Sequence, residues 1–352
     1  MRKYYTRACN FFYGLNSRKL VNKKLTLPLC GDNLTSFNQI EIFTRNKKNI
    51  KSKTVYLKDV QKLPKAVKGQ VVQDIKKITL KREFVKKKSH AIMGILNMTP
   101  DSFSDGGKFN SLKKATKRIN DMKKGGADII DIGGESTRPG SKIISQKNEL
   151  QRVKKIVEKF KKKFPQTLLS IDTRKSLVMD YSIKNKVDII NDISCFRFDP
   201  KTFYSVRNKN LWKIIHHMQG TPQNMQKNPK YNHVLLDIFD FFEAEIKKFI
   251  NDKYKNKIIL DPGIGFGKNL KHNLMILNKI SIFHSLGFPI LIGTSRKRFI
   301  NQISGHYDTK ERIGGTLSSI TFSFSQGIKI FRVHNVEEVK QGLLVFETLL
   351  NK

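Results

Sequence analysis

The chain has 352 residues, of which 68 are Lys or Arg and 29 are Asp or Glu, so its formal net charge at pH 7 is +39. This length allows one large α/β barrel with an appendage, or two ordinary domains. Such a charge can signal nucleic acid or an anionic membrane as partner, but lysine is spread along the whole chain and aromatic residues do not alternate with basic ones. We therefore predict a solvated lysine surface, with no nucleic acid and no membrane as partner.

The N-terminal quarter is the more basic part. Residues 1–89 contain 23 basic and 5 acidic residues, and they end in the lysine-rich segment REFVKKKSH, which is typical of a linker. The first 31 residues contain no acidic residue, which faintly resembles an organelle transit peptide. The segment LTLPLCGDNLTSFNQIEIF that follows has turn and strand patterns, and this favours a folded bacterial N-terminal region. We predict a basic extension of unknown role at 1–89 and a barrel domain at 90–352.

Cys9, Cys30 and Cys195 form no CxxC pair and have no zinc-type spacing, so neither a disulfide framework nor a structural metal is expected. No apolar run approaches the roughly 18 residues that a membrane-spanning helix needs. We expect reduced thiols and a cytoplasmic location.

From His90 onward, short apolar segments alternate with segments of helical period. The predicted strands are AIMGILN, ADIIDIGG, LLSIDT, DIINDIS, LWKIIHH, KIILDPG, PILIGTS and IKIFRVHN. The predicted helices lie at about 111–124, 146–164, 175–185, near 203, at 234–251 and 270–286, up to 326, and at the C-terminus. Eight strand–helix units in about 260 residues predict an α/β fold, a (β/α)8 TIM barrel with an N-terminal extension. A doubly wound open sheet is the alternative.

Polar residues gather at the carboxyl ends of these strands, the face at which barrels carry their active sites. They are Asn97, Asp131, Asp172, Asn191, His217, Asp261, Ser295, Arg332 and His334. Any one of them could cap the following helix, but capping does not explain the same end of nearly every strand. Two carboxylates and a carboxamide suit the planar N–H edge of a 2-aminopyrimidinone ring. Cationic groups on the opposite side, including Lys297, suit a carbonyl oxygen or a phosphate.

The segment KIILDPGIGFGK invites a phosphate-loop interpretation, which we reject because no Ser or Thr follows its GK pair. We expect Gly263, Gly265 and Gly267 to bend the backbone sharply away after the sixth strand, where a side chain would crowd the pocket. Lys268 could contact either ligand or solvent.

Eight segments closely resemble, in order and spacing, the signatures of dihydropteroate synthase. They are MGILNMTPDSFSDGG, DIGGESTRPGS, SIDTRKS, IINDIS, HMQGTPQNMQ, LDPGIGFGKNLKHN, GTSRKRFI and RVHNV. The resemblance covers essentially all of 90–352. It implies a transferase of folate synthesis that joins 4-aminobenzoate to 6-hydroxymethyl-7,8-dihydropterin pyrophosphate, releases pyrophosphate, and is a sulfonamide target. It also implies a homodimer.

The resemblance assigns roles to matching positions. The positions of Asp172, Asn191 and Asp261 hold the pterin ring, and Lys297 reaches the pterin oxygen and flanks the aminobenzoate. Arg332 and His334 hold the pyrophosphate and, with Lys297, are the catalytic candidates. Asn97 serves a Mg²⁺ ion. Ser295, at a helix N-terminus, receives the aminobenzoate carboxylate. Thr137, Arg138 and Pro139 lie near the aminobenzoate, and loops at about 98–108 and 135–144 close over the site.

The chain departs from the family at the pterin wall, where His216 replaces a common Met. We expect a partly exposed histidine that adjusts locally, and not a metal ligand, because no acid or Cys stands at ligand spacing. We assign Phe266 to the core and Phe103 to the loop. The rivals are a methyltransferase-type pterin-binding barrel, an inactive pterin-binding homologue and a basic nucleic-acid-binding protein. The nucleophile is an aromatic amine that is neutral near pH 7, so no catalytic triad is needed.

Overall fold

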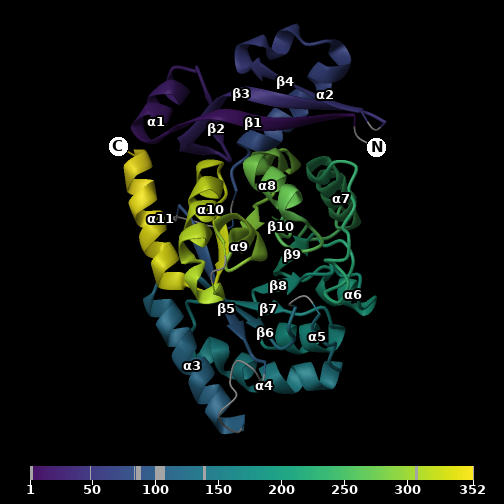
Figure 1. The fold of residues 1–352 in the computed structure, drawn as a ribbon, viewed down its shortest axis with the longest axis vertical. Coiled ribbons are helices and arrows are strands. Elements are labelled where there is room, and N and C mark those ends of the chain that lie inside the picture. The colour runs from purple at the N-terminus through teal and green to yellow at the C-terminus, as the bar shows by residue number, and fades with distance from the viewer. Residues whose placement is uncertain are drawn as a thin grey trace.

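The computed structural model describes residues 3–47, 49–82, 84, 89–99, 108–137, 140–305 and 308–351. These residues form two sheets, one of eight parallel strands and one of four antiparallel strands (Figure 1). The larger sheet lies wholly after residue 90 and the smaller one wholly before residue 57.

The eight parallel strands are β5 (Ala91–Asn97), β6 (Ile129–Gly133), β7 (Leu168–Asp172), β8 (Ile189–Asp192), β9 (Trp212–His216), β10 (Ile258–Asp261), β11 (Leu291–Ile292) and β12 (Ile330–Val333). Their order in the sheet is β10-β9-β8-β7-β6-β5-β12-β11. A parallel bridge between Leu260 and Ile290 joins the two ends of this order. The sheet is therefore a closed barrel, and the predicted (β/α)8 fold is confirmed.

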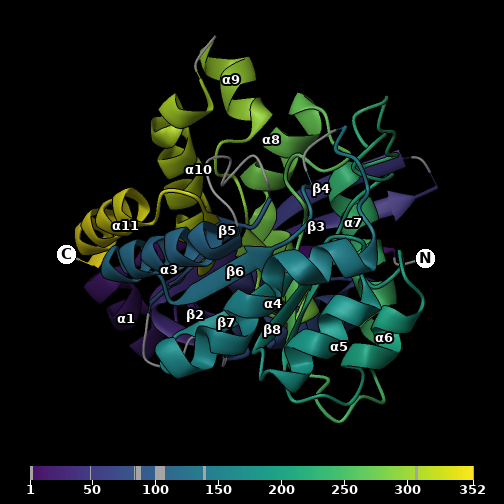
Figure 2. The ribbon, with the colours of Figure 1, turned by 90° about the horizontal axis from the view of Figure 1, so that it is seen from below.

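Helices follow the strands and cover the outside of the barrel (Figure 2). They are α3 (Lys108–Lys124), α4 (Gln146–Lys163), α5 (Ser176–Lys184), α6 (Lys201–Val206), α7 (Val234–Lys248), α8 (Leu270–Asn278), α9 (Arg298–Ser304), α10 (Ile313–Ser325) and α11 (Val336–Asn351). Two predicted helices are interrupted. The segment 270–286 is α8 followed by the 3-10 helix η3 (Ile280–Leu286), and the segment ending at 326 also contains η4 (Thr309–Glu311).

The interior of the barrel is closed at the end where the strands begin. A cluster of inward-facing apolar side chains from seven strands fills this end: Ala91, Met93, Ile129, Ile189, Ile214, Ile259, Leu291 and Ile330. Phe84, from the segment before β5, packs edge-on against Trp212 at 4.8 Å between ring centroids. Because side chains fill the interior at this end, polar groups carried by the strands can converge inside the barrel only at the opposite end.

The N-terminal residues fold into a sheet with its own core. Its strands are β1 (Tyr4–Tyr13), β2 (Leu27–Leu29), β3 (Asp32–Asn46) and β4 (Asn49–Tyr56), and its helices are α1 (Gly14–Asn22), η1 (Leu57–Lys62) and α2 (Lys65–Thr79). The long strand β3 pairs with β1 on one edge and with β2 and β4 on the other. Val71 and Ile78 of α2 pack with Phe37 and Ile40 of β3. We call residues 3–82 the extension.

The extension docks along one flank of the barrel, from the start of α7 across η3 to the end of α11 (Figure 1). Arg45, whose side chain is 3% exposed, donates hydrogen bonds to Asp237 (2.8 Å) and Asp240 (2.7 Å) of α7. At the other end of the flank, Asp32 pairs with Lys329. All seven residues of η3 are buried. This contact explains why the helical segment after α8 changes form at residue 279.

Within the described part of the chain, no helix is both long enough and apolar enough to cross a membrane.

Candidate functional site

The strand register aligns the predicted polar residues at the mouth of the barrel. Asn97 pairs with Gly133, Gly133 with Asp172, and Asp172 with Asn191 across four neighbouring strands. On the far side of β9, Asp261 pairs with His216. Because parallel strands in register end at one level, these side chains share the carboxyl-terminal face of the barrel.

The centre of the mouth is an ion-paired cluster around Arg332. Its Nε donates to Asp131 Oδ2 and its Nη2 to Asp172 Oδ2, both at 2.7 Å. Asp131 also accepts from Ser170 Oγ (2.6 Å) and Asn191 Nδ2 (3.1 Å). We expected Arg332 opposite the acids, on an anion-binding side. The structure instead joins it to them, because these carboxylates need a cation to offset their burial.

This cluster perturbs the proton affinity of Asp172. Burial, together with the charges of Asp131, Glu149 and Asp192, raises the pKa of Asp172 to about 7, although Arg332 opposes the rise. Burial alone would lower the pKa of the Arg332 guanidinium, but the carboxylates of Asp131 and Asp172 raise it above its ordinary value. Arg332 is therefore a permanent cation, whereas Asp172 titrates near neutrality.

Asn191 presents an open acceptor beside this cluster. Its Nδ2 is used by Asp131, and this fixes the orientation of the carboxamide. Its buried Oδ1 has no hydrogen-bond partner among the described residues. A buried carbonyl oxygen without a partner costs about 1–3 kcal/mol, so this atom is suited to an N–H donor of a ligand.

Asp261 lies at the end of β10 and is fixed by the glycine-rich loop that follows. Its Oδ1 accepts from the backbone amide of Gly263 at 2.8 Å. Burial raises the pKa of Asp261 to about 6, although the Gly263 amide and three cations, Lys297, Arg332 and Lys268, oppose the rise. Gly263 has φ +66°, and a Cβ there would lie 2.0 Å from the carbonyl oxygen of His217. The predicted sharp bend of this loop is confirmed.

Lys297 brings an amine to the same space. Its Nζ lies 4.0 Å from the ring centroid of Phe266. Burial and the charge of Arg332 lower the pKa of the amine to about 8, while Asp261 and Asp172 act in the opposite direction. The Lys297 amine is thus a hydrogen-bond donor that interacts electrostatically with both Asp261 and Asp172.

His216 and Phe266 form the wall next to Asp261. The imidazole is 3% exposed, so our expectation of a partly exposed histidine is wrong. Its ring meets Phe266 edge-on at 4.7 Å, and its Nε2 lies 3.9 Å from Asp261 Oδ2. Burial and the nearby cations, first Lys268, hold the pKa of His216 well below its ordinary value. Phe266 is buried with Ile193 and Met225, as predicted.

Ser295 and His334 bond each other at the strand ends. Ser295 Oγ lies 3.1 Å from His334 Nδ1 and accepts from the His334 backbone amide at 3.2 Å. Helix α9 begins at Arg298 with Lys297 as its N-cap. Ser295 therefore lies three positions before the first residue of the helix. We had expected it at the helix N-terminus, and the structure does not place it there.

Asn97 is half-buried at the end of β5, and its carboxamide bonds no other residue that the structure describes. Thr137 is half-buried in the segment after β6. Arg138, Pro139 and Phe103 lie outside the described residues, as does most of the first predicted loop.

The sequence did not reveal a buried charge network behind the second predicted loop. Lys175, 2% exposed, donates to Glu135 (2.8 Å) and Glu149 (2.7 Å). Glu135 also accepts from Arg174 at 2.9 Å and from the backbone amide of Ile144 at 3.0 Å. The network ties both ends of 135–144 to the barrel. Its members are far apart in the chain, and only the SIDTRKS and GGEST segments could have indicated them.

Lys268, whose contact the sequence left open, is buried below the mouth. Its Nζ donates to the carbonyl oxygen of Phe266 at 2.9 Å and lies 3.0 Å from His217 Nδ1. Burial lowers the pKa of Lys268 well below its ordinary value. This lysine holds the glycine-rich loop and does not face solvent.

Known proteins resemble this chain in sequence and in fold. Residues 93–334 match the family model "Pterin binding enzyme". The dihydropteroate synthase of Escherichia coli K12 is 42% identical over 261 residues, covering 74% of this chain and 92% of that protein. The Yersinia pestis enzyme, solved in complex with a sulfonamide drug, is 39% identical with a TM-score of 0.69, covering 74% and 93% of the two chains. The Xanthomonas albilineans enzyme with 7,8-dihydropteroate is 28% identical with a TM-score of 0.67, covering 75% and 95%. The chain belongs to the pterin-binding enzyme family, as a dihydropteroate synthase.

Proposed function

We propose that the chain condenses 6-hydroxymethyl-7,8-dihydropterin pyrophosphate with 4-aminobenzoate to give 7,8-dihydropteroate and pyrophosphate. The observation that carries the proposal is the set of acceptors around one amine at the barrel mouth. Asn191 Oδ1 is an open acceptor, and Asp261 keeps one carboxylate oxygen free after bonding Gly263. A 2-aminopyrimidinone offers N–H donors that suit such acceptors.

The polar groups of the mouth have separate roles toward the pterin ring. Asp261 and Asn191 read the N–H edge of the pterin, while Lys297 donates to its carbonyl oxygen. Asp172 adds a carboxylate oriented by Arg332. His216 and Phe266 supply a flat wall beside the ring. Burial raises the pKa values of Asp172 and Asp261 in the free protein. N–H donors of the bound pterin favour the ionised carboxylates and lower these pKa values again.

The pyrophosphate leaving group requires positive charge from the protein around it. Departure of pyrophosphate places negative charge on its oxygens, and preorganised cations stabilise that charge. Arg332 keeps its Nη1 without a partner among the described residues, although its other nitrogens bind the acids. His334 follows two residues after Arg332, directly after the end of β12. The amine of 4-aminobenzoate is neutral near pH 7, so the chain needs no strong general base.

Asn97 is the residue that we propose for Mg²⁺. Magnesium usually takes one or two protein oxygens and completes its shell with water and substrate phosphates. The Asn97 carboxamide makes no bond within the described chain, and no group of three acidic, His or Cys ligands occurs there. This fits an ion that arrives with the pyrophosphate, whose charge the ion would neutralise when bound.

A pyrophosphate-release assay with both substrates and Mg²⁺ tests the proposal. We expect release that depends on 4-aminobenzoate and falls when a sulfonamide competes with it. Asp261→Ala should abolish saturable binding of the pterin substrate. Release by folded protein that is independent of 4-aminobenzoate would contradict the proposal, as would pterin binding that survives in Asp261→Ala.

We infer that the protein acts in the cytoplasm as a homodimer. Large apolar side chains of α10 and α11 are exposed, namely Phe322, Leu344, Val345 and Leu349. Helices α10 and α11 pack side by side, so these residues offer a contiguous surface to a second copy. Light scattering should give twice the chain mass, and Val345→Glu should reduce it to one chain mass. A monomer in the unmodified protein contradicts the dimer.

A further inference from the structure

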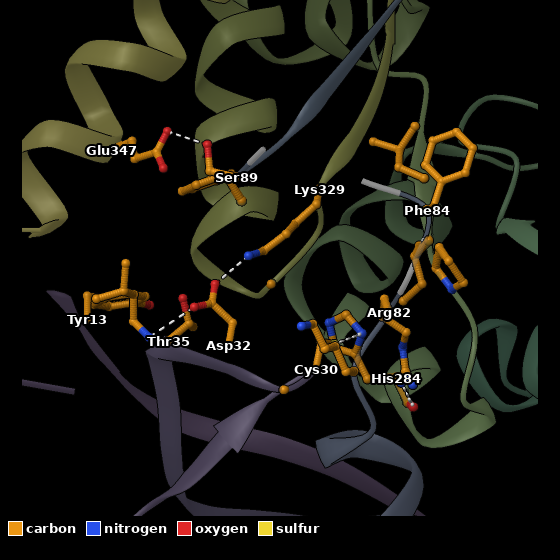
Figure 3. Close-up of a pocket in the computed structure, with 18 of the residues that line it drawn as sticks. Tyr13, Cys30, Asp32, Thr35, Arg82, Phe84, Ser89, His284, Lys329 and Glu347 are labelled. Atoms are coloured by element: carbon orange, nitrogen blue, oxygen red, sulfur yellow. Dashed lines mark hydrogen bonds and ion pairs between the residues drawn. The ribbon is translucent and has the colours of Figure 1, made fainter. Parts of the chain in front are cut away.

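A second cavity lies between the extension and the end of the barrel where the strands begin. Its volume is about 360 Å³, within the range of roughly 300–1,000 Å³ that is typical of small-molecule sites. Its lining includes residues of the β2–β3 turn and of η3, and also residues from the start of β12 and from the end of α11 (Figure 3). None of the residues that we assign to pterin or aminobenzoate lines this cavity.

A cysteine–histidine pair occupies one wall. Cys30 Sγ lies 3.3 Å from His284 Nδ1, and His284 Nε2 lies 2.9 Å from the carbonyl oxygen of Gln326. A carbonyl can only accept, so Nε2 carries the proton and Nδ1 is left to accept from the thiol. This is the arrangement in which a histidine activates a cysteine nucleophile.

The electrostatics of the cavity distinguish Cys30 from the other two thiols. Burial would raise the pKa of Cys30, but the charge and hydrogen bond of His284, with Arg82 and Lys329, bring it down to about 7. Burial raises the pKa of both Cys9 and Cys195. At pH 7 about half of Cys30 is thiolate, against about 1% for a thiol of ordinary pKa.

The backbone at Cys30 is also unusual. Cys30 (φ +54°) and Gly31 (φ +72°) are the two central residues of the β2–β3 hairpin. Two-residue hairpins with positive φ at both positions favour Asn-Gly or Asp-Gly. A cysteine there is not explained by the turn, whereas it is explained by the thiol that it brings to the cavity.

Arg82 places a partly unpaired cation next to this thiol (Figure 3). Its Nη2 donates to the carbonyl oxygen of His284 at 2.9 Å. Its Nε and Nη1 are buried and have no hydrogen-bond partner among the described residues. Lys329, by contrast, is paired with Asp32, and Glu347 accepts from Ser89. Arg82 and the exposed Lys81, which also lines the cavity, therefore give it positive charge that suits a carboxylate.

We propose that this cavity is a thiol-modification site, at which Cys30 exchanges with the disulfide of a small, carboxylate-bearing thiol. The Cys30 proton passes to His284 Nδ1, and the thiolate attacks one sulfur of the disulfide. A new S–S bond forms to Cys30 while the old one breaks. The electron pair leaves on the second sulfur, which takes the proton from His284. Arg82 binds the carboxylate of the attached half.

The full chain is incubated at pH 7 with glutathione disulfide, neutral hydroxyethyl disulfide or cationic cystamine, and the mixed disulfides are mapped by mass spectrometry. We expect Cys30 to react about tenfold faster than Cys9 or Cys195, or more. Glutathione disulfide should react fastest and cystamine slowest. Equal rates at the three cysteines would overturn the proposal.

Two variants with controls separate the thiol from its surroundings. Cys30→Asn suits the turn and should fold with an unchanged melting temperature but lose the fast formation of a mixed disulfide. Arg82→Gln should remove the preference for glutathione disulfide over cystamine, whereas Arg207→Gln, exposed on another face, should keep it. Fast formation of a mixed disulfide that persists in Cys30→Asn overturns the thiol assignment. A rate order that is the same in Arg82→Gln overturns the carboxylate assignment.

Discussion

The two ends of the barrel both hold buried charge, but they obtain it differently. At the mouth, the acids and the amide lie at or near the carboxyl ends of parallel strands, and the strand register brings them together. At the other end, apolar side chains fill the interior, and the charged groups come partly from the docked extension, with Asp32 and Arg82, and partly from the barrel, with Lys329 and Glu347. A barrel thus provides its own site at one end, whereas the opposite end gains a polar cavity only when another element covers it.

The largest expected effect separates the two ends by function. Asp261→Ala leaves the pterin N–H edge without its acceptor, and losing one member of a buried charged pair costs about 2–5 kcal/mol. We expect pterin affinity to fall by about 100-fold or more in isothermal titration. Disulfide exchange at Cys30 should be unchanged. A similar decrease in pterin affinity and in the rate of disulfide exchange at Cys30 would show that the two ends of the barrel are not independent.

Lys297→Ala tests whether the Lys297 amine at the barrel mouth contributes to the reaction. We expect kcat to fall by about 100-fold, because the variant loses a donor to the ring oxygen. Unfolding free energy should change by less than about 1 kcal/mol, since the amine is costly to bury and contacts a ring face. Lys268→Met is the matched control. It should lose about 1–3 kcal/mol of stability by leaving the carbonyl oxygen of Phe266 unpaired.

The raised pKa of Asp261 predicts a stability that depends on pH. Its folded pKa of about 6 lies above the ordinary 3.8, so the folded state binds the proton more tightly and ionisation destabilises it. This cost is absent below pH 3.8 and complete above pH 6. Asp261→Asn removes it and should stabilise the protein by about 2–3 kcal/mol at pH 8, but not at pH 4. Equal denaturation midpoints of wild type and variant at pH 8 would contradict this.

The raised pKa values of the two acids also predict how binding depends on pH. The pterin donors need ionised Asp172 and Asp261, so pterin affinity should fall as pH decreases through 7 to 6. Titration of binding from pH 8 to 5 checks this. Affinity that is constant over the range would mean that neither carboxylate accepts from the ligand.

The smallest effect concerns the docking of the extension. Arg45→Met breaks both ion pairs to α7 and should cost about 1–3 kcal/mol of stability, with kcat unchanged. Lys62→Met, which removes the exposed pair with Asp59, should leave the urea midpoint unchanged, because water and salt screen such a pair. Urea denaturation of both variants measures the difference. An equal effect of the two would show that Arg45 does not hold the extension in place.

The order of strands and the level of the site residues could be predicted because both depend on local pattern. Asn97, Asp172, Asn191 and Asp261 were identified as strand ends, and the parallel register of the barrel then places them together. The pairing of Arg332 with Asp131 and Asp172 could not be predicted, since it joins side chains 201 and 160 residues apart.

The extension shows the same limit more strongly. Its strands and turn were visible in the sequence, but its partners on the barrel were not. His284 meets Cys30 across 254 residues, and no periodicity or spacing relates the two. Docking depends on complementary surfaces that form only after both parts fold, so composition alone could not indicate the second cavity.

The docking of the extension has a consequence for synthesis on the ribosome. Its hairpins pair residues that are close in sequence, so they can form as soon as they emerge. The bonds from Arg45 to α7 span 192 and 195 residues, and the pair of Asp32 with Lys329 spans 297. The extension therefore emerges before its partners on the barrel and completes its contacts late. Until α7 and β12 have been synthesised, the face of β1 and β3 that carries Tyr5 and Arg45 is in contact with water or with a chaperone.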